Sequence, residues 1–597
     1  MRFSVLAQYL EKLEATASRN DMTKILAEIY AKAEWEEVDK LSYLLLGELL
    51  PAYAQVEFQI AEKTMVLALA EAYGIRAPRV TKVFRRTGDL GDAAYELSER
   101  KHGGRGYLTV TEVYDRMYGI AEDWGAGSQE RKIKAMASLL GGLDRVSAKF
   151  VARIPVGKMR LGFSEATLLD ALSLMLKGDK SARPAIERAY SVTADIGAIA
   201  KRVKKGGLAV LARLQAEPGT PIRPSLAERV SRVADAMEKA GPTVGLEEKL
   251  DGLRVQAHVW RDGGARRVSL FSRNLENTTA MFPEIVTAVR RLGIRSAILD
   301  GEAIGYNHAT GVFAPFQETI QRKRKHQVAA FAEKIPLSMF VFDILYLDGR
   351  SLLDAPFRKR RAILERILSK KDDTLRLTSY EETSNSARVA KALTESVGRG
   401  LEGLVAKNLE SPYVPGSRGF HWVKLKATTA ALSGLRDSGT AMKGLPDTID
   451  CVVMGAYRGR GKRAAFGVGG FLLGVRAKDG SYHSLSRLGT GLSDDIFREA
   501  YRRVRALETK EQPKEYHIEK ETAPDIWLRP SLVVEILADE ITRSPRHTAG
   551  KKEAVGKGYS LRFPRLVRFR DDKKAEDATT DTEVAKMFKK SSKNSSS

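Results

Sequence analysis

The stretch LEEKLDGLRVQAHV, residues 246 to 259, decides how the middle of the chain folds. From Leu253 onward, every second residue is apolar, which predicts a strand with one face toward a core. Lys249 and Asp251 precede this strand and, at strand spacing, project to one face. Gly252 permits a turn or a close approach between them and Arg254. The sequence therefore places a lysine and a carboxylate where a strand begins.

Further patterns divide the chain into regions of different structure. Strand-like runs at SAILDGEAI, LSMFVFDILYL, GLVAK and WVKLK alternate with helical runs such as Arg358 to Leu368, which predicts a mixed α and β middle region. The first 215 residues or so have helical periodicity, with Leu6, Tyr9 and Leu13 on one stripe, and we expect Asn20 and Asp21 to cap a second helix. The short runs IDCVVMGAY, GGFLLGV and LVVEIL predict a small β-barrel.

Proline and glycine positions suggest the domain boundaries. The segment AEPGTPIRPS carries Pro218, Pro221 and Pro224, which predict an extended, semi-rigid connection. A polar segment from about Ser433 to Asp447 leads into the third region. The expected parts are a helical domain at 1–216, an α+β domain at 217–432, a strand-rich domain at 433–585 and a disordered tail at 586–597.

Charge and cysteine content limit the class of protein. The 99 Lys and Arg residues against 75 Asp and Glu give a net charge of +24. This charge fits either a polyanionic partner or a basic surface that only binds water, and the motifs must decide between the two. The single cysteine, Cys451, cannot form an internal disulfide, and a reducing compartment fits. No run approaches the ~20 apolar residues of a membrane span, and we reject a signal peptide. We expect a cytoplasmic protein, associated with the nucleoid if prokaryotic.

Several common nucleotide and metal sites are missing from the sequence. The segment AYRGRGKRA lacks the first glycine and the final Ser or Thr of a P-loop, and GVGGFLLG does not fit G-x-G-x-x-G. The eight histidines show no paired spacing, so we do not expect a zinc hydrolase.

Lys249 has two interpretations. A lysine normally has a pKa of about 10.4, but desolvation or nearby cations can favour the free amine, which could then attack a phosphorus atom. The alternative is a surface lysine paired with Glu247 or Glu248. Other clusters favour the first interpretation.

Two sets of charged residues suit a metal and phosphates. LDGEAI places Asp300 and Glu302 on one strand face, and EGLVAK adds Glu402 and Lys407. Separated carboxylates suit Mg²⁺, which binds few protein oxygens and keeps water and phosphate ligands.

In WVKLK, Lys424 and Lys426 share a strand face and would repel each other unless an anion lies between them. Arg273, in FSRN, could hold a phosphate or ribose. Phe342 is either a core aromatic or a platform for a flat base.

The ordered series EKLDGLR, SRN, LDGEAI, VFDILYLDG, EGLVAK and WVKLK resembles the motifs of the covalent nucleotidyltransferases, which include ATP-dependent DNA ligases, RNA ligases and capping enzymes. The segments GTPIRPSLA and SLRFPRLVRFRDDKKAEDATT and the helical N-terminal third resemble replicative DNA ligases of archaea and eukaryotes. The resemblance covers nearly the whole chain. NAD-dependent ligases fit less well, because their zinc-binding cysteines have no counterpart here.

The resemblance implies a fold and a reaction. It implies an all-α N-terminal DNA-binding domain, an α+β nucleotidyltransferase (adenylation) domain and a C-terminal OB-fold β-barrel. It also implies an ATP-dependent DNA ligase that acts in replication, repair and recombination, through a lysyl-AMP intermediate, AMP transfer to a 5′-phosphate and attack by a 3′-hydroxyl. The implied cofactors are ATP and Mg²⁺, with Mn²⁺ as a substitute, and ADP or GTP stay open as donors.

The resemblance also assigns roles to particular residues. Lys249 is the implied nucleophile, Glu247 contacts adenine, and Phe342 stacks on the base. The remaining implied roles are phosphate and ribose contact by Arg254 and Arg273, ribose or metal contact by Glu302, metal contact by Glu402, phosphate contact by Arg418, Lys424 and Lys426, and orientation of pyrophosphate by the R-x-D-K residues Arg570, Asp572 and Lys573.

The implied partner is nicked double-stranded DNA, and we expect a monomer. RKHGGRGYLTV lacks the Q-x-x-F-F-like segment that recruits a sliding clamp in some archaeal relatives, so clamp binding stays open. The rival hypotheses are an RNA ligase or capping enzyme and a DNA-binding scaffold with a decayed site. The candidate DNA contacts are Arg153, Lys158 and Arg160 in RIPVGKMRLGFS, and Arg458, Arg460, Lys462 and Arg463 in a basic loop.

Overall fold

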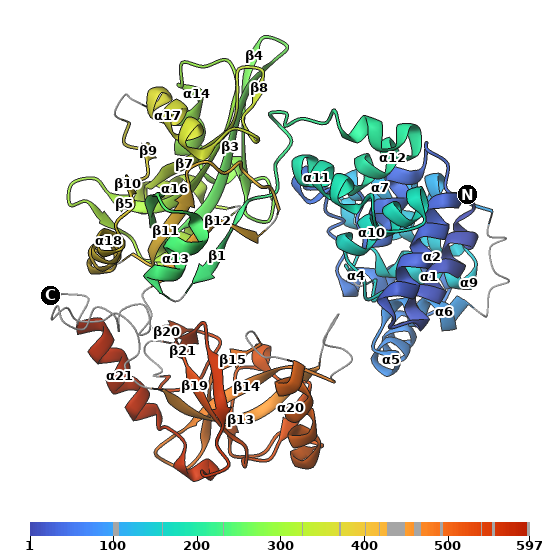
Figure 1. Cartoon of the computed structure of the whole chain (residues 1–597). Helices are drawn as coiled ribbons and strands as arrows, with labels where there is room; N and C mark the ends of the chain where they lie inside the picture. The colour runs from blue at the N-terminus through green and yellow to red at the C-terminus, as the bar shows by residue number, and fades with distance from the viewer. Residues whose placement is uncertain are drawn as a thin grey trace. The chain divides into compact units, whose positions relative to one another are not determined.

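The computed structural model describes most of the 597 residues (Figure 1). The chain forms two compact units. The first comprises Met1–Glu228, Leu250–Glu381 and Lys407–Trp422, and the second comprises Arg229–Lys249, Glu382–Ala406 and Val423–Ser597. The described ranges are 1–98, 107–157, 159–230, 232–324, 326–368, 372–399, 401–416, 418–426, 448–458, 467–489, 494–538, 540–551 and 556–593.

The N-terminal region is helical, as predicted. The predicted stripe is buried, since Leu6 and Leu13 are fully inside and Tyr9 nearly so. The cap prediction was wrong, because Ser18, not Asn20 or Asp21, caps the second helix. The helices described here are α1 (Phe3–Ala15), α2 (Arg19–Lys32), α3 (Val38–Leu46), α4 (Glu62–Tyr73), α5 (Ala77–Thr87), α6 (Leu90–Leu97), α7 (Val110–Glu122), α8 (Ser128–Gly141), α9 (Arg145–Arg153), α10 (Glu165–Lys177), α11 (Arg183–Thr193) and α12 (Ile196–Leu211).

A largely antiparallel sheet in the order β4-β3-β5-β7-β8 follows, with short β6 pairing with β5 and β9 pairing in parallel with β7. Helices α14 and α17 pack one face into a core (Figure 1). Arg360 of α17 and Asp343 of β7 form a fully buried ion pair at 2.7 Å. The elements are β3 (Leu253–Asp262), β4 (Ala265–Ser272), α14 (Pro283–Arg290), β5 (Ala297–Asn307), β6 (Val312–Phe313), α15 (Phe316–Thr319), α16 (Val328–Lys334), β7 (Leu337–Leu347), β8 (Arg350–Ser351), α17 (Phe357–Ile367) and β9 (Leu375–Leu377).

The second face of β3 is buried too, beneath the proline-rich connection. The Gly219 N–H donates to His258 Nδ1 at 3.0 Å, and the Ile222 N–H donates to Gln256 Oε1 at 2.8 Å. Gln256 Nε2 returns a hydrogen bond to the Ile222 carbonyl at 3.1 Å. The polar half of the alternating strand therefore binds the connection instead of facing water.

A five-stranded sheet in the order β1-β12-β11-β2-β10 carries Lys249 at the end of β2. Helices α13 and α18 bury its apolar side, where Val423 and Leu425 lie fully inside. The elements are β1 (Leu226–Val230), α13 (Val233–Ala240), β2 (Val244–Lys249), β10 (Tyr380–Thr383), α18 (Ser386–Gly398), β11 (Gly403–Asn408) and β12 (Arg418–Lys426).

The C-terminal region is rich in strands, as predicted. Its main sheet runs β16-β18-β13-β14-β15-β17, with β19 joining β13 to β22, and β20 pairs with β21. Over the described residues these pairings do not close into a ring, so a closed barrel was not confirmed. The elements are β13 (Ile449–Arg458), β14 (Val468–Arg476), β15 (Tyr482–Leu488), α20 (Asp494–Leu507), β16 (Glu508–Thr509), β17 (Tyr516–His517), β18 (Ile526–Leu528), β19 (Val533–Leu537), β20 (Glu540–Ser544), β21 (Gly558–Arg562), β22 (Arg565–Phe569) and α21 (Asp581–Lys593).

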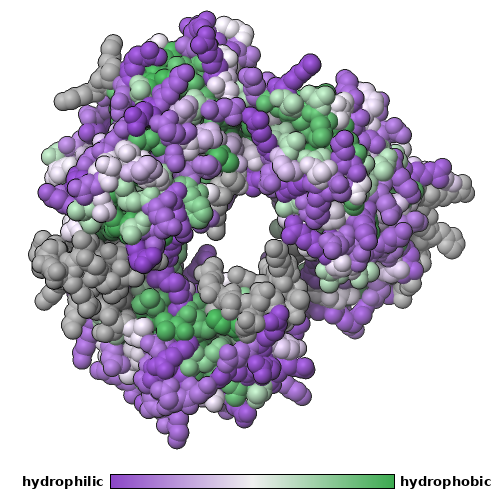
Figure 2. Space-filling model, in the orientation of Figure 1, coloured by the Kyte–Doolittle hydropathy of each residue, from purple (hydrophilic) through white to green (hydrophobic). Residues whose placement is uncertain are grey.

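The chain end differs from the prediction of a tail without structure from residue 586. Helix α21 begins at Asp581 and continues to Lys593. Its Val584 is fully buried, and Met587 and Phe588 pack on the same core. Residues 594–597 lie outside the described part. Hydrophilic side chains predominate on the face in Figure 2. No helix in the described part of the chain is long and apolar enough to cross a membrane.

Candidate active site

Lys249 lies in a cluster of oppositely charged side chains on neighbouring strands. Its Nζ is 2.5 Å from Glu402 Oε2, and Lys426 Nζ is 3.2 Å from Glu402 Oε1. The backbone reinforces the pairing, because the Glu402 N–H donates to the Lys249 carbonyl at 3.2 Å. Strand order explains the meeting: β11, which follows Glu402, lies between β2 and β12. The Glu402 carboxylate therefore pairs with both Lys249 and Lys426.

The neighbours and exposure of Lys249 bear on its two interpretations. Glu247 is buried and Glu248 pairs with Arg399, whereas the Lys249 ammonium pairs with Glu402. The Lys249 side chain is 23 % exposed. It is therefore partly sheltered yet reachable, as a nucleophile must be.

Glu402 is also a candidate metal ligand. Burial raises the pKa of Glu402, but Lys249 and Lys426 outweigh that effect and hold the pKa below its ordinary value. An ionised carboxylate oxygen fits Mg²⁺, which uses one or two carboxylates together with phosphates and water. Among the described residues no group of three His, Cys, Asp or Glu could hold a metal ion without such other ligands. The donor chemistry fits a metal that arrives with phosphates.

Arg254, five residues beyond the end of β2, is held in a separate network. Its Nε and Nη2 donate to the two oxygens of Asp300 at 3.1 and 2.7 Å, and its Nη1 donates to the Ser225 carbonyl at 2.6 Å. Tyr413 Oη also accepts from Nη2 at 3.2 Å and donates to Asp300 at 2.7 Å. Four guanidinium N–H groups are thus used within the protein. Asp300 is fully buried, so this pair is internal.

Phe342 lies beside Arg254 in an aromatic group. Its ring meets Trp422 edge to face with centroids 5.7 Å apart. The buried Lys407 donates to the Phe342 carbonyl at 3.1 Å and places its Nζ 4.8 Å from the ring centroid. The Phe342 ring is only partly buried. Part of the ring thus packs against Trp422 and part of its surface is accessible. Trp422 begins the motif WVKLK, but its contact with Phe342 was not predicted, and no motif marked Tyr413.

The other predicted nucleotide-site residues occupy varied positions. Glu302 is partly buried on β5, directly opposite Arg254 in the register with β3. Arg273 is exposed just after β4, and Lys424 is partly buried on β12. Arg418 begins β12, but its side chain lies outside the described residues.

The R-x-D-K residues form a cluster in the C-terminal region. Arg570 pairs with Asp572 at 2.8 Å and with Asp450 at 3.0 Å, and Lys573 pairs with the same Asp450 at 2.7 Å. Sequence reasoning missed Asp450, which lies far away in the chain.

The predicted DNA contacts need one correction. Arg153 is only 1 % exposed and pairs with Glu14, Asp89 and Asp92, so the prediction that it contacts DNA was wrong. Arg160 is 49 % exposed. Arg458 is exposed at the end of β13. The side chains of Lys158, Arg460, Lys462 and Arg463 lie outside the described residues.

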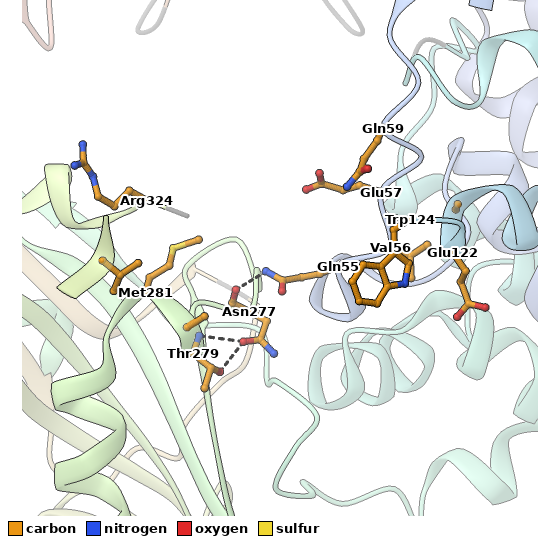
Figure 3. Close-up of a pocket in the computed structure, with 13 residues that line it drawn as sticks. Gln55, Val56, Glu57, Gln59, Glu122, Trp124, Asn277, Thr279, Met281 and Arg324 are labelled. Carbon is orange, nitrogen blue, oxygen red and sulfur yellow. Dashed lines mark hydrogen bonds between the residues drawn. The ribbon is translucent and has the colours of Figure 1, made fainter. Parts of the chain in front are cut away.

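The first unit also contains a pocket that is separate from the Lys249 cluster. Figure 3 shows its lining, which includes Gln55, Trp124 and Asn277, with the Gln55 amide donating to the Asn277 carbonyl. It contains none of the predicted site residues. The pocket is therefore not the candidate active site.

Three family models match the chain. They are described as "DNA ligase N terminus" over residues 2–173, "ATP dependent DNA ligase domain" over 224–426 and "ATP dependent DNA ligase C terminal region" over 464–573. A "Probable DNA ligase" of Dictyoglomus turgidum is 40% identical over 594 residues, covering 99% of this chain and 98% of that protein. A "DNA ligase" of Cenarchaeum symbiosum is 38% identical over 602 residues, with coverage of 99% and 98%.

A solved structure also resembles the chain. "Pmar-Lig_PreS3" superposes with a TM-score of 0.54 at 18% identity, covering 94% of this chain and 99% of that one. At that identity the likeness concerns the fold alone.

Proposed function

The chain belongs to the family of ATP-dependent DNA ligases, and we propose its chemistry from one observation. Lys249 is the lysine of the K-x-D-G-x-R motif, and it pairs with Glu402, which also pairs with Lys426. Lys249 Nζ attacks the α-phosphorus of ATP, an N–P bond forms, the bond to the β-phosphate oxygen breaks and pyrophosphate leaves. The AMP passes to the 5′-phosphate of a nick. The 3′-hydroxyl then attacks that phosphate, and AMP leaves as the strand closes.

Glu402 controls the nucleophile in this proposal. The attacking amine needs a free lone pair, so Lys249 must give up a proton and its ion pair with Glu402 before it reacts. Mg²⁺, when bound to Glu402 and to phosphates, would offset charge on the phosphate oxygens. Lys426, now 3.2 Å from Glu402, would then be drawn to phosphate instead. Glu302, Arg418 and Lys424 are proposed to assist as metal or phosphate contacts.

The nucleotide contacts are proposed from the resemblance and adjusted by the packing. Phe342 is proposed to stack on adenine, with Glu247 reading its edge and Arg273 reaching the ribose or phosphate. Arg254 has four N–H groups bound to protein oxygens. We therefore assign it mainly to holding β3 and β5 in place, with ligand contact as a smaller role. Arg570, Asp572 and Lys573 are proposed to orient pyrophosphate.

The partner is proposed to be a nicked duplex, bound mainly through its phosphates. Arg160 and Arg458 are the described candidates for these contacts, and the net charge of +24 supports a polyanion. We propose a monomer that works in the cytoplasm or on the nucleoid. An RNA ligase is the alternative, and parallel assays on nicked DNA and nicked RNA distinguish the two.

The test is the intact mass of the protein after incubation with ATP and Mg²⁺ but no DNA. The wild type should gain one AMP, and Lys249→Ala should not. Lys239→Ala, which changes an exposed lysine on α13, is the matched control and should behave as wild type. Nicked DNA should then remove the adduct. A wild type, first freed of bound AMP, that gains none from ATP, ADP or GTP would contradict the proposal.

A further inference from the structure

Arg570 is surrounded by carboxylates of its own domain. Its Nε and Nη2 each lie 2.8 Å from an oxygen of Asp572, and its Nη1 lies 3.0 and 3.2 Å from the two oxygens of Asp450. Glu535 is 3.8 Å from the same Nη1. The Arg570 side chain is only 13% exposed. An incoming anion would have to displace one of these carboxylates to reach it.

Lys573 is held differently. Its Nζ donates to Asp450 Oδ2 at 2.7 Å, and its side chain is 31% exposed. A turn fixes its spacing from Arg570, because the Lys573 N–H donates to the Arg570 carbonyl at 3.2 Å. An ammonium group has three donors. Lys573 can therefore keep its bond to Asp450 while it donates to a further oxygen.

Asp450 is the rigid member of the cluster. It lies on β13 between the fully buried Ile449 and Cys451 and pairs in register with Glu535 of β19. Its N–H donates to Thr579 Oγ1 at 3.0 Å, and its carbonyl accepts from the Thr579 N–H at 2.9 Å. The carboxylate thus projects from backbone that is fixed on two sides.

We propose that Asp450 is a positioning residue for pyrophosphate departure: it bridges Arg570 and Lys573, so that Arg570 serves as the internal support and Lys573 is the cation that meets the leaving group. The inference rests on the proposed function. Two cations so close would repel each other without the shared carboxylate. Charge-assisted hydrogen bonds are the strong class of hydrogen bond, so one carboxylate can fix both side chains.

The proposal separates two steps of the reaction. Pyrophosphate leaves only during self-adenylation, whereas the last step, on a nick that already carries AMP, releases AMP alone. Asp450→Asn keeps the shape of the side chain and removes its charge. It should slow single-turnover self-adenylation at least tenfold and change sealing of a pre-adenylated nick less than twofold. Asp450→Glu should recover part of the lost rate.

A double-variant cycle tests the bridge itself. If Asp450 acts through Lys573, then Asp450→Asn should add little to the loss caused by Lys573→Met. Glu519→Gln, which breaks the ion pair with Lys551 in the same domain, is the matched control and should leave both steps unchanged.

Three outcomes would overturn the inference. One is Asp450→Asn with wild-type self-adenylation. Another is faster self-adenylation by Asp450→Asn. That result would mean that the Asp450 carboxylate only repels pyrophosphate and does not position Lys573. The third is an equal loss in both steps together with a lower Tm, which would mean that Asp450 serves only the fold. Failure of the wild type to form lysyl-AMP is a distinct result, which refutes the proposed function first.

Discussion

Acid should loosen the contact between β3 and the proline-rich connection through His258. The imidazole is fully buried, its Nδ1 accepts from the Gly219 N–H at 3.0 Å, and its Nε2 lies 2.9 Å from Gln256 Oε1, to which it donates. Burial lowers the pKa of His258 from its ordinary 6.5 to about 3. Protonation would convert Nδ1 from an acceptor to a donor facing another donor, so the folded protein resists it.

The sign of the pH effect follows from proton binding. Between the two pKa values, only the unfolded chain takes up the proton, so the free energy of unfolding falls as the pH falls below about 6.5. At about 1.4 kcal/mol per pKa unit, lowering the pH from 7 to 5 should remove about 2 kcal/mol. The loss should grow until the pH approaches the folded value of about 3.

The comparison protein is His258→Asn, whose side-chain oxygen can still accept from the Gly219 N–H but cannot titrate. Both proteins are equilibrated in urea at pH 7 or pH 5 and then pulse-labelled by hydrogen exchange at one fixed pH. Peptides that cover β3 report the unfolding midpoint by mass spectrometry. The wild type should lose about 2 kcal/mol more than the variant between the two pH values. An equal loss in both proteins would refute the assignment to His258.

Three more predictions concern stability and binding. Asp343→Asn should cost about 3 to 5 kcal/mol in urea unfolding, since it leaves a buried arginine unpaired, whereas Asp354→Asn, in an exposed pair, should change the midpoint little. Gly252→Ala should reduce self-adenylation and folded yield, because a Cβ there would lie 2.5 Å from a backbone oxygen of β5. Gly293→Ala is the control, since its Cβ would meet nothing within 4 Å, and activity and circular dichroism are measured for both variants. Arg160→Glu should weaken binding to a nicked duplex and flatten its salt dependence by about one unit of slope, measured by fluorescence anisotropy.

The sequence predicted the parts of the site that depend on strand geometry. Val423 and Leu425 face the core, and Lys424 and Lys426 share the other face, as a period of two requires. Glu402 was recognised as a charged residue of the site, but its pairing with Lys249 was not predicted. That pairing depends on β11 lying between β2 and β12, and strand order is not encoded in periodicity.

Other features could not be predicted, because they depend on distant partners. The polar side chains Gln256 and His258 have the pattern of a solvent-facing strand side, yet the preceding connection covers them. Asp450 joins a cluster 120 residues further along the chain. Helix α21 was missed because its polar sequence resembles a loose tail, and only the burial of Val584 and the packing of Phe588 explain why it is ordered.

The error at Arg153 leaves the argument from net charge intact. Arg153, Lys149 and Arg160 pair with Glu14, Asp89 and Asp92, so this cluster contains three charges of each sign. A buried ion pair such as Arg153 with Asp89 removes one positive and one negative charge from the surface, so the surplus of +24 remains on other groups. Arg160 differs from Arg153, because 49 % of its side chain is exposed, and it stays a candidate contact. Net charge can thus indicate a polyanionic partner even though it cannot identify the arginines that touch it. Choosing those residues requires knowing which acids fold against them, and Glu14 lies 139 positions away from Arg153.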